Sequence, residues 1–248
     1  MKQHDAHEIE RAFQAWLNST PGTDTLTDSL KRVALINFTL DYLAEKKRRV
    51  QNREFTEDER FKIYDKIAKT CGNVRGLIYR ICGHWLRDTN GDVVTTNGVS
   101  MVLLSGAEQA CEKEMVRNGY TGEVEDYVYP NYKTIVNQGC DDCFHTATIY
   151  LDHILGLPDV PKKATREAYY VDFQHGETRV RYDLAYLISF VQIAKQLGKK
   201  KNIAFNVQFG RERTQSVWKL NESNATFILM PVRIQMRDAE KLVKTFNI

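Results

Sequence analysis

The chain has 248 residues, with 35 Lys and Arg against 32 Asp and Glu, which gives a formal net charge of +3. Hydrophobic residues make up 42% and charged residues 27% of the sequence. These fractions are close to globular averages, so they exclude a collagen, a coiled-coil rod and a fully disordered chain. The length permits one large domain or two small ones, and either could bury a sizeable core.

The sequence carries no targeting or membrane signal. Its first ten residues are polar, with charges of both signs, and lack the apolar stretch of a signal peptide. No run of eighteen apolar residues occurs, which excludes a membrane span. The five cysteines are odd in number, and the chain is too long to need disulfides, so reduced thiols are expected. We therefore expect a cytoplasmic protein without a membrane partner.

Charge is divided unevenly along the chain. Residues 1–90 carry a net +3, residues 91–160 a net −8 and residues 161–248 a net +8. Such asymmetry favours electrostatic partnering, either with nucleic acid or between copies of the chain. The alternative is that the acidic and basic segments neutralise each other inside one protomer.

The first 160 residues are predicted to be mainly helical. Apolar spacing and capping signals indicate helices over 6–17, 26–50, 56–70, 73–87, 105–118, 131–137 and 139–155. One β-hairpin interrupts them over 93–104, where Asn97-Gly98 separates two β-prone runs.

After residue 160 the hydrophobic period changes to that of strands. We expect a hairpin over 169–182, a helix over 183–197, strands over 203–209, 216–220 and 225–234, and a short helix over 237–246.

These elements predict an α+β fold in two parts. A mostly helical part with one β-hairpin covers 1–160, and a smaller part made of an antiparallel sheet with helices covers 161–248. The two parts could also form one continuous domain.

The predicted helix 139–155 contains the residue types of a zinc site. Cys140 and Cys143 form a CxxC pair with histidines nearby, and thiolate and imidazole suit tetrahedral zinc. On a helix both cysteines lie on the apolar face, while the polar residues fall on the opposite face, so one ion cannot collect ligands from both. A zinc site would require either that the helix begins after Cys143 or that Cys82 and His84 fold over to complete the ligand set. Otherwise the cysteines are buried core residues.

A candidate catalytic pair lies on the other face of the same predicted helix. Asp142 and His145 are spaced i, i+3, and a carboxylate that orients an imidazole is half of a general-base arrangement. No GxSxG motif supplies a nucleophile, and surface Asp–His pairs are usually inert. The dinucleotide-binding, P-loop, HExxH, EF-hand and zinc-deaminase patterns are absent too, so no cofactor is expected.

Basic residues cluster at three places. They are the run Lys46, Lys47, Arg48 and Arg49, the run Lys199, Lys200 and Lys201, and the pair Arg211 and Arg213. Because basic groups neutralise phosphates, the clusters are candidates for binding RNA or single-stranded DNA. The alternative is a solvated charge run that keeps a sheet edge from aggregating.

Two functional hypotheses follow from these patterns. The favoured one is a non-enzymatic protein that assembles with itself and contacts nucleic acid through the basic clusters, in a nucleoprotein-like, capsid-like or scaffold role. The alternative is a zinc-containing protein or a hydrolytic enzyme centred on 139–155.

Overall fold

The computed structural model divides the chain into two units, residues 1–56 and residues 57–248. The structure describes residues 11–16, 18, 35, 39, 55–74, 81–140, 142–158, 160–161, 168–211, 214–232 and 242–248. In the first unit, 11–16 are helical, within the helix expected over 6–17. Most of the helix expected over 26–50 lies outside the described residues.

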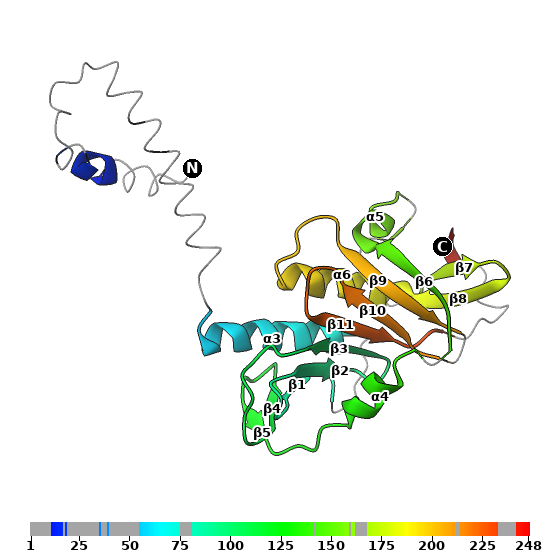
Figure 1. The fold of residues 1–248 in the computed structure, drawn as a ribbon, viewed down its shortest axis with the longest axis horizontal. Coiled ribbons are helices and arrows are strands. Elements are labelled where there is room, and N and C mark those ends of the chain that lie inside the picture. Colours follow the sequence, from blue (N-terminus) through cyan, green and yellow to red (C-terminus); the bar gives the residue numbers. More distant parts are fainter. Residues whose placement is uncertain are drawn as a thin grey trace. The chain divides into compact units, whose positions relative to one another are not determined.

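The second unit is built mainly of strands (Figure 1). In chain order its elements are α3 (Glu57–Gly72), β1 (His84–Arg87), β2 (Val93–Thr96), β3 (Ser100–Leu104), β4 (Met115–Asn118), β5 (Val124–Glu125), α4 (Tyr132–Gln138), β6 (Cys143–Tyr150), α5 (Leu151–Leu155), β7 (Tyr170–His175), β8 (Thr178–Asp183), α6 (Leu184–Gln196), β9 (Ala204–Gly210), β10 (Ser216–Leu220), β11 (Ala225–Leu229) and β12 (Leu242–Asn247). The expected α+β fold with a mostly helical N-terminal part and a single hairpin was therefore wrong: the described unit is mostly β, and six of its strands lie between residues 57 and 160.

Nine strands form one antiparallel sheet in the order β5-β4-β1-β2-β3-β11-β10-β9-β6. Near its centre β3 pairs with β11, with Val102 opposite Phe227. The same arrangement, a helix followed by three antiparallel strands, occurs on each side of this junction. It is formed by α3 with β1–β3 on one side and by α6 with β9–β11 on the other. A second, three-stranded sheet has the order β12-β7-β8. Strands from both sides of residue 160 share the large sheet, and the division into parts 1–160 and 161–248 stays a prediction.

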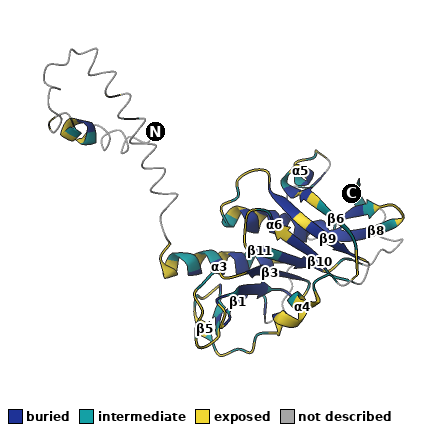
Figure 2. Cartoon of the chain, in the orientation of Figure 1, coloured by how far each residue is buried: buried dark blue, intermediate teal, exposed yellow. Residues whose placement is uncertain are grey.

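The helices α3 and α6 pack on the same face of the large sheet, beside each other. Trp85 of β1 contacts the rings of Phe61 and Tyr64 on α3, and Phe190 of α6 lies 4.7 Å from Phe227, between ring centroids. Asp183 caps α6 by accepting a hydrogen bond from the N–H of residue 185, which satisfies a donor that the helix start leaves open. Figure 2 shows the central strands β3, β10 and β11 as buried.

Trp218 of β10 lies at the centre of this core and is fully buried. The rings of Phe173, Tyr182, Phe190, Phe205 and Phe209 surround it at 5.5–6.2 Å. Aromatic rings at such distances add about 0.5–1.5 kcal/mol per pair to the effect of burial. This cluster therefore holds α6, the large sheet and the three-stranded sheet together.

The short helix α4 is held on the opposite face of the sheet through Asp88. This carboxylate accepts hydrogen bonds from the Tyr132 hydroxyl at 2.7 Å and from the backbone N–H groups of Asn90 and Asp92. The Lys133 ammonium lies 3.0 Å from it. Burial opposes ionisation of Asp88, but these donors outweigh it and lower the pKa of the carboxyl. Asp88 therefore acts as an ionised anchor for α4.

Where local signals decided the structure, the predictions were confirmed. The structure has the helices expected at 56–70, 131–137 and 183–197, the hairpins at 93–104 and 169–182, and the strands at 203–209 and 216–220 to within a few residues. The strand expected over 225–234 begins at Ala225 as β11 but ends at Leu229.

Four predicted helices were wrong. In 105–118 the Glu108 carboxylate accepts hydrogen bonds from Arg60 and Tyr64, at 2.7 and 2.9 Å, so it does not cap a helix, and the segment ends in β4. In 139–155, residues 143–150 form the strand β6, which pairs with β9, and only 151–155 are helical, as α5. The helix expected over 73–87 is replaced at its C-terminal end by the strand β1. The last described residues of 237–246 belong to β12, which pairs in parallel with β7. In each case a partner distant in sequence overrides the local pattern.

Candidate nucleic-acid interface

Lysines line the outward side of α3, where Lys62 and Lys66 are exposed and Lys69 is half-buried. Lys62, Lys66 and Lys69 stand at i, i+4 and i+7, so they share one stripe of the helix. The opposite side of α3 carries Tyr64 and Ile67, which are buried against the sheet. Lys62 and Lys69 are seven residue steps apart on the helix, so the stripe is about 10 Å long.

The C-terminal end of α6 continues this basic surface. Lys195 is exposed there, and the side-chain amide of Gln196 donates a hydrogen bond of 2.8 Å to the Thr70 hydroxyl on α3. This bond brings the last turns of the two helices together. We define the lysine face as Lys62, Lys66, Lys69, Lys195, Lys199, Lys200 and Lys201, the last three of which lie in the turn between α6 and β9.

Two members of the lysine face have contacts that orient them. The Lys199 ammonium lies 3.3 Å from a carboxylate oxygen of Glu222, and the Lys69 ammonium lies 5.8 Å from the centre of the Tyr120 ring. Among the described residues, the other five ammonium groups form no ion pair. The face thus offers mobile positive charges to an anionic partner.

Arg211 lies apart from the lysine face. It follows the far end of β9, and the seven residues of that strand separate it from Lys201 by roughly 23 Å. Its guanidinium forms an ion pair of 3.3 Å with Asp142 instead. The remaining predicted members of the basic clusters, Lys46, Lys47, Arg48, Arg49 and Arg213, lie outside the described residues.

The candidate zinc ligands are not brought together. Cys82 and His84 lie at the start of β1, whereas Cys140 and Cys143 lie at the start of β6, six strands away across the sheet and therefore roughly 29 Å apart. The described part of the chain holds no group of three or more His, Cys, Asp or Glu that could bind a metal ion. None of the five cysteines forms a disulfide.

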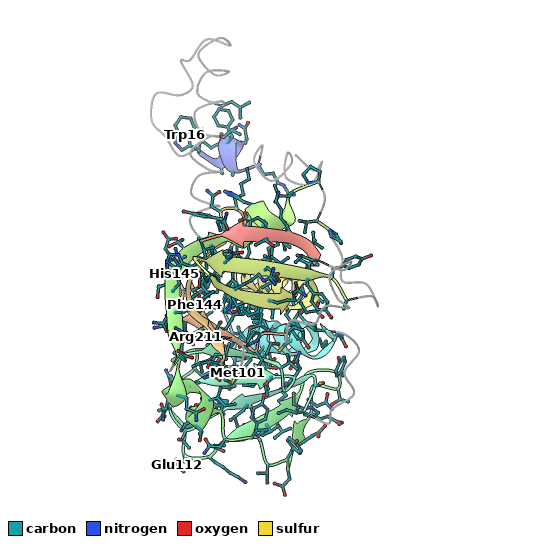
Figure 3. All side chains as sticks on the ribbon, turned by 90° about the vertical axis from the view of Figure 1, so that its right-hand side faces the viewer. Trp16, Met101, Glu112, Phe144, His145 and Arg211 are labelled. Atoms are coloured by element: carbon teal, nitrogen blue, oxygen red, sulfur yellow. The ribbon has the colours of Figure 1, made fainter. Side chains whose placement is uncertain are left out.

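The candidate catalytic pair is not formed either. Asp142 is occupied by Arg211, and the His145 ring stacks on that of His175 with the centroids 3.9 Å apart. Partial burial, and then the neighbouring His175, lower the pKa of His145. Figure 3 shows His145, Phe144 and Arg211 along the same side of the molecule. No general base next to a nucleophile results.

Sequence reasoning missed four members of the lysine face. Lys62, Lys66, Lys69 and Lys195 are separated in sequence, so a search for contiguous basic runs passes over them. The available signal was the i, i+4, i+7 spacing on a predicted amphipathic helix.

Comparison with solved structures identifies the architecture. The structure is similar to a DNA polymerase sliding clamp from Pseudomonas aeruginosa, with 8% identity over 71% of this chain and 64% of that chain and a TM-score of 0.54. A sliding clamp (DNA polymerase III subunit beta) from Bartonella birtlesii, bound to griselimycin, matches with 10% identity, 71% and 64% coverage and a TM-score of 0.53. The DNA polymerase sliding clamp from Caulobacter crescentus matches with 13% identity, 70% and 64% coverage and a TM-score of 0.50.

The fold is sliding-clamp-like. The chain spans less than two thirds of the length of these clamps. No family model matches the sequence, and no curated protein does. None of the described helices is long and apolar enough to cross a bilayer.

The clamp-like fold corrects both functional hypotheses drawn from the sequence. The nucleoprotein-like, capsid-like or scaffold role was wrong, since the fold resembles that of sliding clamps. The zinc protein or hydrolytic enzyme centred on 139–155 was wrong as well, because that segment is an edge strand and its polar groups are dispersed.

Proposed function

We propose that this protein is a DNA clamp that assembles from several copies of the chain and holds duplex DNA against the lysine face. The observation that carries the proposal is the pair of neighbouring helices under one sheet, whose outward lysines are gathered from α3 and α6. A duplex carries one negative charge per ~1.7 Å of its axis, so the 10 Å stripe on α3 alone can face about six phosphates.

The small number of exposed rings supports a duplex over a single strand. Among the described residues, α3 and α6 themselves expose no aromatic ring on their outward sides, and Trp218 is buried in the core. Tyr120 is exposed beside Lys69, and its hydroxyl donates a hydrogen bond to the side chain of Asn73. Proteins that bind single strands stack bases on aromatic side chains, whereas lysines alone contact the backbone. The lysine face therefore suits binding that is independent of sequence, as a clamp that moves along DNA requires.

The edge strand β6 supports assembly between copies. Within the described residues β6 pairs with β9 alone, and it carries no Lys, Arg, Asp or Glu over its eight residues. The N–H of Leu151 bonds to the carbonyl of Ile203, so by alternation residues 146, 148 and 150 direct their backbone groups away from β9. Proteins normally protect such an edge with charge or with a covering segment. An uncharged edge strand is therefore a surface for a second copy.

Light scattering coupled to size-exclusion chromatography tests this proposal. We expect a defined oligomer that becomes a monomer when Thr148→Lys places a charge in the β6 edge. Thr245→Lys makes the same change in β12, the edge strand of the small sheet, and should leave the mass unchanged. A wild-type monomer at every protein concentration and salt would overturn the assembly.

Binding to labelled duplex DNA, single-stranded DNA and RNA of equal length tests the partner. Tightest binding is expected for duplex DNA, and tighter binding of either single strand would refute the duplex assignment. The cytoplasmic location stays a prediction that follows from the same proposal.

A further inference from the structure

An acidic groove lies at the end of the large sheet opposite β6. It has a volume of about 780 Å³, and its walls are residues 112–116 and 124–129. The strands β4 and β5 pair only through Val116 with Glu125 and Arg117 with Val124, and the groove follows the segments beyond this pairing. In Figure 3 the strand β12 is drawn in red, and Glu112 lies at the opposite end of the unit.

The charge of the groove excludes a phosphate-bearing ligand. Glu112, Glu114 and Asp126 are exposed on its walls, and among the described residues Lys113 is the single basic one that lines it. Glu125 also lines it, with its carboxylate held by the side chain of Asn118 at 2.7 Å and by His84 at 3.2 Å. Nearly the whole groove belongs to the segment 91–160, whose net charge is −8. Its electrostatic complement is a cation.

Apolar side chains give the groove a second property. Val128 is 91% exposed and Val124 62% exposed, which is unusual for valines, and both line the groove. Tyr127 anchors this wall by packing its ring 5.8 Å from that of His84. A partner would therefore bury apolar contacts as well as pair with the carboxylates.

The free edge of β5 offers main-chain hydrogen bonds. Asn118 donates its N–H to the carbonyl of Glu123, so these two residues form a hydrogen-bonded pair. In an antiparallel ladder the next pair, Arg117 with Val124, is not hydrogen-bonded, and Val124 directs its N–H and C=O away from β4. Within the described residues β5 is the terminal strand of the sheet. An extended chain can therefore add to it.

From these three properties we infer that the groove binds an extended, lysine- or arginine-rich peptide segment of another protein, which adds to the β5 edge and places apolar residues against Val124 and Val128. This site lies outside the lysine face, and it goes beyond the proposed DNA clamp. The protein would bind DNA through one surface and a cationic partner protein through another.

Fluorescence anisotropy with a short labelled peptide of alternating lysine and valine tests the inference on the full chain. We expect saturable binding, and we expect no binding of the matching glutamate–valine peptide. The variant Glu112→Lys/Glu114→Lys should weaken binding about tenfold, since exposed charge pairs contribute up to ~1 kcal/mol each. Glu177→Lys, an exposed change in the β7–β8 turn, is the control and should have no effect.

Strand addition has a separate test that leaves the protein unchanged. The same lysine–valine peptide, N-methylated at every second residue, cannot bond along the β5 edge and should lose its binding. Equal binding of the methylated peptide, equal binding to the Glu112→Lys/Glu114→Lys variant, or competition by duplex DNA would each overturn the inference. A change in oligomer mass in that variant would show that the groove is instead a contact between copies, and would refute a peptide partner.

Discussion

Replacing the three lysines of the α3 stripe tests the lysine face most directly. The perturbation is Lys62→Gln/Lys66→Gln/Lys69→Gln, which removes three charges while keeping residues of similar helix propensity. These side chains point away from the core, so stability should change little.

The magnitude follows from counterion release. Each neutralised phosphate contributes about −0.9 to the slope of log affinity against log salt, so the triple variant should lose about 2.7 from that slope. Between about 50 and 200 mM salt, wild-type affinity for duplex DNA should then fall about 40-fold further than that of the variant.

The assay is anisotropy of a labelled duplex, titrated at several salt concentrations. Lys113→Gln/Lys219→Gln/Lys244→Gln is a matched control, because it removes three exposed lysines that lie outside the lysine face. The side chain of Lys219, next to the buried Trp218 on β10, points to the sheet face opposite α3 and α6. An unchanged slope in the α3 variant, or an equal change in the control, would refute the reasoning.

Three further predictions concern stability and reactivity. Asp88→Asn should cost about 2 kcal/mol in urea unfolding at neutral pH, because it weakens the bonds from Tyr132 and its neighbours. Since the pKa of Asp88 is lowered in the fold, its contribution is complete above the unfolded-state pKa near ~3.9 and is lost as pH falls through the folded value, so the difference between wild type and variant should shrink on acidification. Phe227→Ala should cost about 3–5 kcal/mol by opening a cavity at the sheet centre, measured in the same urea titration. Burial raises the pKa of Cys71 to about 12, so iodoacetamide at mildly alkaline pH should label exposed Cys143 and leave Cys71 unmodified until the chain unfolds, as mass spectrometry can show.

The parts of the fold that sequence analysis predicted correctly are those that depend on local signals. Asp183 before an apolar run marks the start of α6, and Asn97-Gly98 marks the hairpin of β2 and β3, because caps and tight turns depend on a few adjacent residues. The alternation over β9 likewise depends only on that strand.

Elements that depend on distant partners could not be predicted in this way. The apolar spacing over 139–155 predicted a helix, yet Cys143 to Tyr150 becomes β6 through pairing with β9, some sixty residues later. The local sequence around Glu108 matches a capping box, but its carboxylate instead accepts a hydrogen bond from Arg60, which lies 48 residues earlier. The lysine face has the same origin, since it exists only where α3 and α6 are placed side by side.

The pairing of β3 with β11 has a consequence for how the chain reaches its fold. Ser100–Leu104 must wait for Ala225–Leu229, which emerge from the ribosome more than a hundred residues later. At ~5–20 residues per second this delay is roughly 6–25 s, during which β3 lacks its permanent neighbour. Contacts of such long sequence separation also slow the folding step itself. A newly made chain therefore spends several seconds with one edge of an uncharged, apolar strand unpaired, so this phase of synthesis is when the protein is most exposed to aggregation and to chaperones.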